Sequence, residues 1–243
     1  NAAAARIEAL VKTHKSLLAN ASHELRSPLT RIRMGLELMG GNQPSPAFRE
    51  EILRNIAELD QLVDEILLAS RLDAREADVG TVELVDLIGL AAEECARVDA
   101  DLDVTAVPEG LEVRGVAKLL RRALRNLLEN ARRYSQGDIT VVLQRHDGQA
   151  QLSVLDRGPG VPPALRERIF EPFYRLPGAS ERAGGVGLGL ALVRSIAQRH
   201  NGSVRCEDQP DGSGGACFVL RLPLQSPPGT AAPAPQRKGT GAK

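Results

Sequence analysis

The stretch Ser22-His23-Glu24-Leu25-Arg26-Ser27-Pro28-Leu29 places a histidine and a neighbouring carboxylate inside a repeat of apolar residues. The repeat has the alternating spacing of four and three that defines a heptad seam. Its positions are Ile7, Val11, His14, Leu18, Ala21, Leu25, Pro28 and Ile32. His23 falls at position f, which points away from the seam. The pattern predicts a helix from near Ala2 to Met39 that leaves His23 solvated, where another domain can reach it.

A second apolar repeat follows a cluster of helix-breaking residues, Gly40 to Pro46. It predicts a helix that ends near Leu72, with apolar positions Ile52, Ile56, Leu59, Val63 and Ile66. Two helices with one apolar stripe each cannot enclose a core, so we expect an antiparallel hairpin that pairs with a second copy as a four-helix bundle. The expected state is therefore a homodimer.

Beyond Gly80 short strands alternate with helices, which fits an α/β sandwich with helices on one face. Helices are predicted from the N-cap Asp86 to about Ala100, over Ala117–Tyr134, Pro163–Phe170 and Gly187–His200. Strands are predicted at Val82–Leu84, Leu102–Val107, Leu111–Val116, Ile139–Arg145, Gln151–Leu155, Ser203–Cys206 and Ala216–Leu222. The strands Ile139–Arg145 and Gln151–Leu155 are expected to form a hairpin around His146-Asp147-Gly148. The predicted class is α+β. Its parts are a hairpin at 1–73, a linker at 74–80, an α/β domain at 81–224 and a disordered tail at 225–243 that is poor in apolar residues.

Composition narrows the class of protein. The chain has 243 residues, 42% hydrophobic and 26% charged, as in ordinary globular proteins. A net charge of zero and only two Tyr, four Phe and no Trp give no sign of a nucleic-acid surface. Cys95, Cys206 and Cys217 lack CxxC spacing, which gives no indication of disulfides or a zinc site. We expect them to be buried as small apolar side chains.

Three further patterns carry phosphate and base chemistry. Asn126 and Asn130 are spaced i, i+4 on one helix face, and their amide oxygens suit Mg²⁺ shared with phosphates. Asp156 follows a strand and opens a glycine loop, where a carboxylate accepts the adenine amine and repels the guanine carbonyl. The run Gly185–Gly189 precedes a helix whose terminal amides suit an anion, and it matches neither a P-loop nor a dinucleotide fingerprint.

The order of these motifs resembles that of the sensor histidine kinases of two-component systems. The motifs are S-H-E-L-R-S-P-L (22–29), N-L-L-E-N-A (126–131), D-R-G-P-G (156–160), I-F-E-P-F-Y-R (169–175) and G-V-G-L-G-L (185–190). The resemblance extends from the first helix to about Leu224. It implies a dimerisation and phospho-acceptor hairpin followed by an ATP-binding domain.

The resemblance also implies roles for individual residues. Asn130 coordinates Mg²⁺, Asn126 lies near the phosphates, Arg133 offers them a cation, Tyr134 packs on adenine and Arg175 contacts the γ-phosphate. The nucleotide set as a whole is Asn126, Asn130, Arg133, Tyr134, Asp156, Gly158, Gly160, Gly185, Gly187, Leu188 and Gly189. The segment between Leu176 and Gly184 is expected to form a mobile lid, in which Arg182 is either a ligand or merely solvated.

The implied activity is ATP-dependent autophosphorylation of His23, with Glu24 hydrogen-bonding or deprotonating the opposite ring nitrogen. The phosphoryl group then passes to an aspartate of a response-regulator receiver domain. Ser27, four residues after His23, is expected to position water for a phosphatase activity, although it could instead bond a backbone carbonyl freed by Pro28. The other histidines, His14, His146 and His200, have no such placement, and His200 is expected to be a favoured cation at a helix end.

Two alternative functions remain open. One is an ATPase of the superfamily that includes gyrase and heat-shock protein 90, against which the S-H-E-L-R-S-P-L motif argues. The other is a scaffold or pseudokinase, against which the intact Asn130, Asp156 and glycine loops argue. Because the chain begins with Asn1 and its heptads are already running by Ile7, it is expected to be the cytoplasmic part of a bacterial inner-membrane sensor, with any membrane contact through segments absent from this chain.

Overall fold

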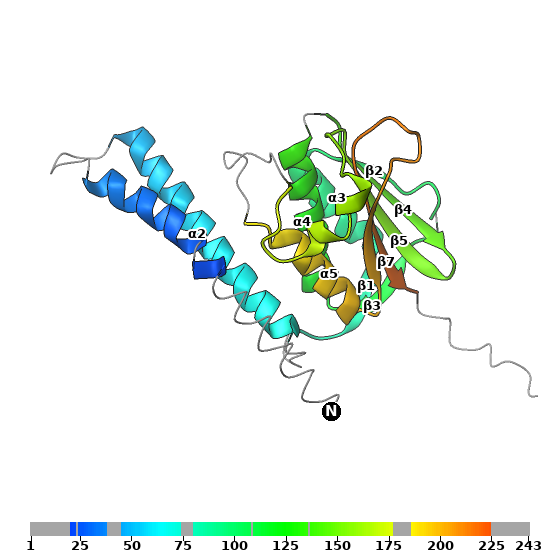
Figure 1. Ribbon diagram of the computed structural model, residues 1–243. Helices are drawn as coiled ribbons and strands as arrows, with labels where there is room; N and C mark the ends of the chain where they lie inside the picture. The colour runs from blue at the N-terminus through cyan, green and yellow to red at the C-terminus, as the bar shows by residue number, and fades with distance from the viewer. Residues whose placement is uncertain are drawn as a thin grey trace, which may run out of the picture.

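The computed structural model describes residues 20–22, 24–37, 45–73, 80–107, 109–135, 137–176 and 186–224. A helical hairpin stands beside an α/β domain (Figure 1). The hairpin consists of a helix over the described residues 20–22 and 24–37, and of α2 (Pro46–Asp73). The α/β domain contains β1 (Glu83–Asp86), α3 (Leu87–Val98), β2 (Asp101–Asp103), β3 (Glu112–Gly115), α4 (Ala117–Tyr134), β4 (Thr140–His146), β5 (Gln149–Leu155), η1 (Pro163–Leu165), η2 (Arg168–Phe170), α5 (Gly189–Arg199), β6 (Ser203–Glu207) and β7 (Cys217–Pro223).

The described part of the first hairpin helix buries the predicted seam, whose positions Ile7, Val11, His14 and Leu18 lie outside the described residues. Ala21 and Pro28 are buried, and Leu25 and Ile32 are half-buried. At Gly35 an added Cβ would overlap the ring of Phe48 in α2, so a side chain there would displace that ring. No helix in the described part of the chain is long and apolar enough to cross a membrane.

The apolar residues predicted on α2 fall into two groups that differ in burial. Ile52, Leu59 and Ile66 are half-buried, whereas Ile56 and Val63 are exposed. Other large apolar side chains of the hairpin are exposed with them, namely Leu29, Met34, Leu36, Leu53 and Leu67. Among the described residues, therefore, the hairpin has many exposed apolar side chains, as expected for a helix pair that needs a second pair to complete its core.

The main sheet has five strands in the order β2-β4-β5-β7-β6, with β2 parallel to β4 and the other pairs antiparallel. The strands β1 and β3 form a separate antiparallel pair. β4 and β5 are joined at Asp147-Gly148, and both residues have positive φ, +48° and +71°. Positive φ at both central residues defines the tight hairpin turn that matches the twist of the strands. The predicted hairpin at this position is confirmed.

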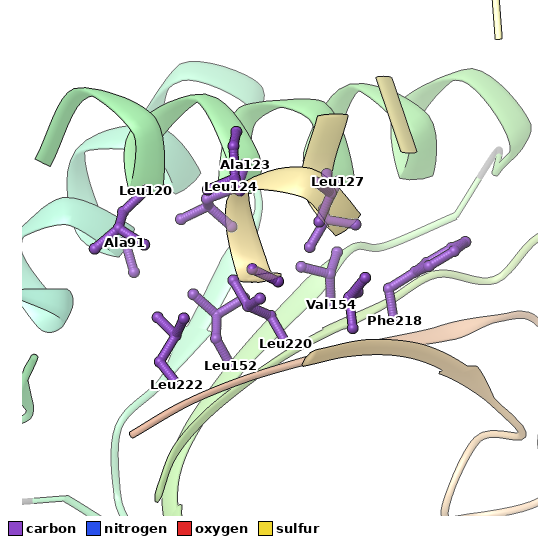
Figure 2. Packing of buried hydrophobic residues seen from close by; sticks show 14 of the residues in the cluster. Ala91, Leu120, Ala123, Leu124, Leu127, Leu152, Val154, Phe218, Leu220 and Leu222 are labelled. Carbon is purple, nitrogen blue, oxygen red and sulfur yellow. The ribbon is translucent and has the colours of Figure 1, made fainter. Parts of the chain in front are cut away.

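The core lies between the sheet and the helices α3, α4 and α5, which cover one of its faces (Figure 1). In Figure 2, Leu120, Ala123, Leu124 and Leu127 of α4 point toward side chains of the sheet. The facing side chains on β5 and β7 are Leu152, Val154, Phe218, Leu220 and Leu222. The spacing of three and four along α4 creates this apolar face, and burying each large side chain contributes roughly 1.5–3 kcal/mol. Packing on the sheet thereby fixes the direction in which Asn126 and Asn130 project.

Two predicted elements are shorter than expected. The strand expected over Leu102–Val107 ends at Asp103, because Asp103 Oδ1 accepts hydrogen bonds from the Thr105 amide (2.9 Å) and hydroxyl (2.7 Å). These bonds, the amide first, lower the pKa of the Asp103 carboxyl and turn the chain away from the sheet. The helix expected over Pro163–Phe170 consists of two separate 3₁₀ turns, η1 and η2.

The expectation that His200 is a favoured cation at a helix end is wrong. His200 is buried, its Nε2 accepts a hydrogen bond from the Val116 amide at 3.0 Å, and its Nδ1 lies 2.8 Å from the Ile196 carbonyl. A ring nitrogen that accepts an N–H carries no proton, so the imidazole is neutral and Nδ1 donates to Ile196. Burial lowers the pKa of His200, against the opposing effect of the Ile196 carbonyl. His200 therefore ties α5 to the start of α4.

The cysteines behave as the sequence predicts. Cys95, Cys206 and Cys217 are buried and carry free thiols. Burial raises the pKa of Cys95 and Cys217 to about 11 and that of Cys206 to about 12. All three thiols stay protonated at neutral pH and pack as small apolar groups.

Candidate functional site

A cavity of about 950 Å³ lies between the α/β domain and the hairpin. The α/β domain contributes the C-terminal half of α4, the loop after β5, the segment that ends at Leu176, and the start of α5. Both hairpin helices contribute charged and polar side chains to the opposite wall. The volume is at the upper end of the range of small-molecule sites, and one wall belongs to the helix that carries the S-H-E-L-R-S-P-L motif.

Asp156 lines this cavity, and hydrogen bonds hold its carboxylate in place. The residue is only 3% exposed, and its Oδ1 accepts hydrogen bonds from the amides of Gly158 (2.8 Å) and Ala216 (3.2 Å). The Asp156 amide in turn donates to the Ala216 carbonyl at 3.0 Å. Two amides on one oxygen fix the orientation of the carboxylate.

Apolar side chains line the cavity beside this carboxylate, namely Val161, Ile169, Leu190 and Phe218. An oriented acceptor among apolar walls suits a flat base that carries an amine.

Backbone crowding around Asp156 requires glycine at two positions. An added Cβ at Gly158 would lie 2.6 Å from the Tyr134 carbonyl oxygen. At Gly215, where φ is +95°, a Cβ would overlap the Asp156 carbonyl oxygen. Gly158 was among the predicted site residues, whereas Gly215 was missed.

Sequence reasoning also missed the loop between β6 and β7 that closes over Asp156. The buried side chain of Gln209 donates through Nε2 to the Asp156 carbonyl, and its Oε1 accepts from the Ser213 hydroxyl at 3.3 Å. The Gly214-Gly215 pair before the last strand was a signal that could have pointed to this loop.

The two asparagines of α4 have different surroundings. Asn126 is buried, and its Nδ2 donates to the Gly189 carbonyl at 3.1 Å, which ties α4 to the first turn of α5. Asn130 is half-buried and lines the cavity one helical turn further on, together with Arg133 and Tyr134. Amide oxygens and a guanidinium on one face are suited to a metal-bound polyphosphate.

The glycine run meets the cavity at the start of α5. Gly187 has φ of +78°, and its carbonyl accepts a hydrogen bond from the Phe173 amide at 2.9 Å. Leu188 is the N-cap residue and is buried, and the helix begins at Gly189. The segment 169–175 is thereby fastened to the glycine run, and Arg175, which is half-buried, lines the cavity beside it.

On the hairpin side, Glu24 and Ser27 line the same cavity. The Ser27 hydroxyl oxygen accepts a hydrogen bond from Arg31 Nη1 at 3.2 Å. An ion pair of 3.1 Å between Glu65 of α2 and Arg122 of α4 joins the two parts of the molecule.

Most of the predicted site residues come together. The cavity is lined by Glu24, Ser27, Asn126, Asn130, Arg133, Tyr134, Asp156, Gly160, Arg175, Gly187 and Gly189. Gly158 bonds Asp156 from beside the cavity, and Leu188 lies in the interior below it. His23, Gly185, Arg182 and most of the predicted lid lie outside the described residues, as do 74–79 of the predicted linker and the tail 225–243.

A divalent cation in this cavity would need oxygen ligands from the residues around it. Within the described ranges, no three His, Cys, Asp or Glu side chains come close enough together to hold a metal ion. A cation here would take its ligands from amide oxygens such as that of Asn130 and from phosphate oxygens. That mixed, oxygen-only set is the preference of Mg²⁺.

Two family models match the chain. Residues 13–75 match the His Kinase A (phospho-acceptor) domain, and residues 115–226 match the histidine kinase-, DNA gyrase B- and HSP90-like ATPase. The sensor histidine kinase CpxA of Escherichia coli (strain K12) is 36% identical over 224 residues, which are 90% of this chain and 49% of CpxA. The signal transduction histidine-protein kinase/phosphatase MprB of Mycobacterium sp. (strain KMS) is 35% identical over 222 residues, 85% of this chain and 43% of MprB. The chain thus spans about half the length of these curated relatives.

Solved structures agree with the sequence matches. A structure of the mycobacterial sensor histidine kinase MprB superposes with a TM-score of 0.51 at 33% identity, over 59% of this chain and 97% of that one. The histidine kinase ThkA, solved in complex with the response regulator protein TrrA, gives a TM-score of 0.69 at 24% identity, over 90% of this chain and 64% of that one. At that identity the second likeness concerns the fold.

Proposed function

The chain belongs to the sensor histidine kinases of two-component systems, and we propose that it binds ATP beside Asp156 and transfers the γ-phosphoryl group to His23. The observation that carries this proposal is the shared cavity. The rigidly held Asp156 carboxylate and the hairpin residue Glu24, next in sequence to His23, line one space. A donor site and an acceptor site need to meet in this way for phosphoryl transfer.

The nucleotide contacts follow from the walls of the cavity. Asp156 accepts the adenine amine, and Tyr134 packs on the base. Arg133 and Arg175 face the phosphates. The backbone amides of Gly187 and Gly189, at the start of α5, donate hydrogen bonds to phosphate oxygens. Asn130, with Asn126 near the phosphates, would hold Mg²⁺, which when bound offsets the negative charge of the phosphate oxygens.

The chemical step uses His23 as the nucleophile. A neutral ring nitrogen, available near pH 7, attacks the γ-phosphorus in line. The N–P bond forms, the bond from phosphorus to the bridging oxygen breaks, and ADP leaves with that electron pair. Glu24 holds or accepts the proton of the opposite ring nitrogen, which stabilises the charge that develops on the ring.

The phosphoryl group on His23 is proposed to pass to an aspartate of a response-regulator receiver domain. The fold shared with ThkA, which was solved with its response regulator, supports a receiver docking on the hairpin. A phosphatase activity toward the same regulator is proposed to use the Ser27 hydroxyl. The likeness to MprB, which is named a kinase/phosphatase, supports this second activity.

We further propose that the chain acts as a homodimer, through the exposed apolar side chains of the hairpin. Ile56 and Val63 of α2 and Leu29 of the first helix are among these side chains, and a second copy would cover them. The curated relative CpxA is named a sensor, and we propose that this chain is the cytoplasmic part of a bacterial inner-membrane sensor.

The proposal is tested with purified chain and γ-labelled ATP in the presence of Mg²⁺. Histidine kinase activity is supported if the protein acquires an acid-labile, base-stable label and the label moves to a receiver domain. ATP hydrolysis without a labelled protein favours a plain ATPase, and the absence of both favours a scaffold. Profiling transfer against a panel of receiver domains identifies the partner.

A further inference from the structure

Arg31 of the first hairpin helix joins Ser27 to the second helix. Its Nε donates to Asn55 Oδ1 at 2.7 Å, its Nη2 to Glu58 Oε2 at 2.8 Å, and its Nη1 to the Ser27 hydroxyl oxygen at 3.2 Å. Ser27 is on the same helix, one turn earlier, whereas Asn55 and Glu58 are on α2. The Arg31 guanidinium therefore bridges the two helices and also hydrogen-bonds the Ser27 hydroxyl.

Of the two α2 partners of Arg31, Asn55 is buried and held in place. Asn55 is 5% exposed, and its Nδ2 donates to the Glu51 carbonyl at 2.8 Å, so its oxygen is the atom presented to Arg31. Glu58 supplies a carboxylate, which makes the second bond charge-assisted. Because the guanidinium is a planar, rigid fork, two bonds to α2 fix the direction of the remaining N–H groups.

The bond from Arg31 determines how Ser27 can act. A hydroxyl has one hydrogen to donate and lone pairs that accept. Because the Ser27 oxygen accepts from Arg31, the hydroxyl hydrogen points away from the guanidinium and can be donated to another group, and Ser27 lines the cavity. The bond from Arg31 thereby couples the direction of the Ser27 hydroxyl to the position of α2.

We infer that Arg31 is a positioning residue for hydrolysis of the phosphorylated response regulator, acting by orienting the Ser27 hydroxyl through its anchors Asn55 and Glu58. This inference rests on the phosphatase activity in the proposed function. The hydroxyl hydrogen is donated to the oxygen of the attacking water. The water oxygen bonds to phosphorus, the bond from phosphorus to the aspartyl oxygen breaks, and inorganic phosphate leaves, with the protons of the water going to phosphate and solvent.

A shift of the first helix relative to α2 would break or lengthen the bonds of Arg31, and the Ser27 hydroxyl would lose its direction. The phosphatase rate would then depend on the relative position of the two helices.

A double-mutant cycle separates this role from a purely structural clamp. The full chain is assayed with the receiver domain that accepts phosphate fastest in the panel, supplied as the phospho-protein. The readout is the ratio of the phosphatase rate to the autophosphorylation rate. We expect Arg31→Gln to lower this ratio about ten-fold in the wild-type background, equivalent to about 1.4 kcal/mol in the barrier. In the Ser27→Ala background the same substitution should change it by less than about two-fold.

Conservative variants and a matched control complete the design. Asn55→Ala should lower the ratio, and Asn55→Asp, which keeps an oxygen acceptor for Arg31, should restore most of it. Arg31→Lys keeps the charge but loses the three-way fork, so it should resemble Arg31→Gln. Arg33→Gln is the control, because Arg33 lies on the same helix and bonds Glu37 of that helix at 2.9 Å. It should leave the ratio unchanged.

Equal effects of Arg31→Gln in the two backgrounds would overturn the inference, as would an unchanged ratio in Arg31→Gln. If Ser27→Ala loses phosphatase activity and Arg31→Gln does not, only the inference fails. If wild type lacks phosphatase activity, or Ser27→Ala retains it, the phosphatase part of the proposed function fails and the inference fails with it. The thermal unfolding midpoint of each variant, measured in the same buffer, shows whether the hairpin remains folded.

Discussion

Glu65 of α2 and Arg122 of α4 form an ion pair that links the hairpin to the α/β domain, with 3.1 Å between Oε1 and Nη2. The Glu65 side chain is 8% exposed, and Gln61 also donates to its Oε1 at 3.1 Å. Burial raises the pKa of the Glu65 carboxyl, while Gln61 and Arg122 act in the opposite direction. A carboxylate this buried depends on its cation, so the pair is a point at which the two parts can be held together or released.

Arg122→Ala should therefore release the α/β domain from the hairpin. Removing one partner of a buried pair costs about 3–5 kcal/mol if the other charge stays buried, and separation of the two parts avoids that cost. Trypsin cleavage after Arg75, in the predicted linker, should become several-fold faster. Arg132→Ala on the exposed face of the same helix is the control and should leave the rate unchanged. Equal rates in both variants would contradict a linking role for the pair.

The buried histidine of the α/β domain predicts a loss of stability in mild acid. The pKa of His200 is lowered by burial, so the folded domain resists a proton that the unfolded chain accepts near pH 6.5. The stabilisation is complete above pH 6.5 and decreases as the pH falls below it, because the unfolded state then binds more protons. Thermal midpoints at pH 7.5 and 5.5 should differ more in wild type than in His200→Gln. Parallel pH profiles would show that another group dominates.

Gly215→Ala should abolish nucleotide binding. Its φ is +95°, and the new Cβ would overlap the Asp156 carbonyl oxygen, displacing the strand end that carries the carboxylate. Gly214→Ala is a stringent control, because Gly214 also has positive φ, +80°, but an added Cβ there has no neighbour within 4 Å among the described residues. That variant should show only the backbone cost of about 1–2 kcal/mol in unfolding free energy. Comparable ATP affinities in the two variants would argue against crowding at Asp156.

Asp156→Asn should weaken ATP binding about ten-fold or more. The asparagine keeps an oxygen for the amides of Gly158 and Ala216, so its NH₂ group replaces the oxygen that receives the adenine amine. Donor then faces donor, and a hydrogen bond to a charged group, worth about 1.5–3 kcal/mol, is lost. Calorimetry on both proteins measures the difference. Wild-type affinity in the variant would place the adenine elsewhere.

The regular elements were predictable because each carries a local periodic signal. The helix Ala117–Tyr134 was predicted with the bounds that the structure has, since its apolar residues recur every three or four positions and its buried face follows from that spacing. The turn at Asp147-Gly148 was predictable for the same reason, because residue type and spacing determine it locally.

What the sequence could not reveal depends on contacts between distant residues. The difference in burial along α2 was missed, because periodicity identifies apolar positions but does not show which of them pack within the same chain and which stay exposed. His200 was misjudged because its partner, Val116, is 84 residues away and its burial is a tertiary property. Gln209 and Gly215 were missed because only the folded loop brings them to Asp156. The Asp156 loop itself was found because its motif is contiguous.

The most direct test of the proposed function is the phosphorylation of His23→Gln compared with wild type. Both proteins are incubated with γ-labelled ATP and Mg²⁺, and ATP affinity is measured in parallel. We predict that wild type acquires an acid-labile, base-stable label and that His23→Gln acquires none, while its ATP affinity stays close to that of wild type, because the nucleotide contacts lie in the α/β domain. The same acid-labile label on His23→Gln would contradict the assignment, since the acceptor would then be another residue.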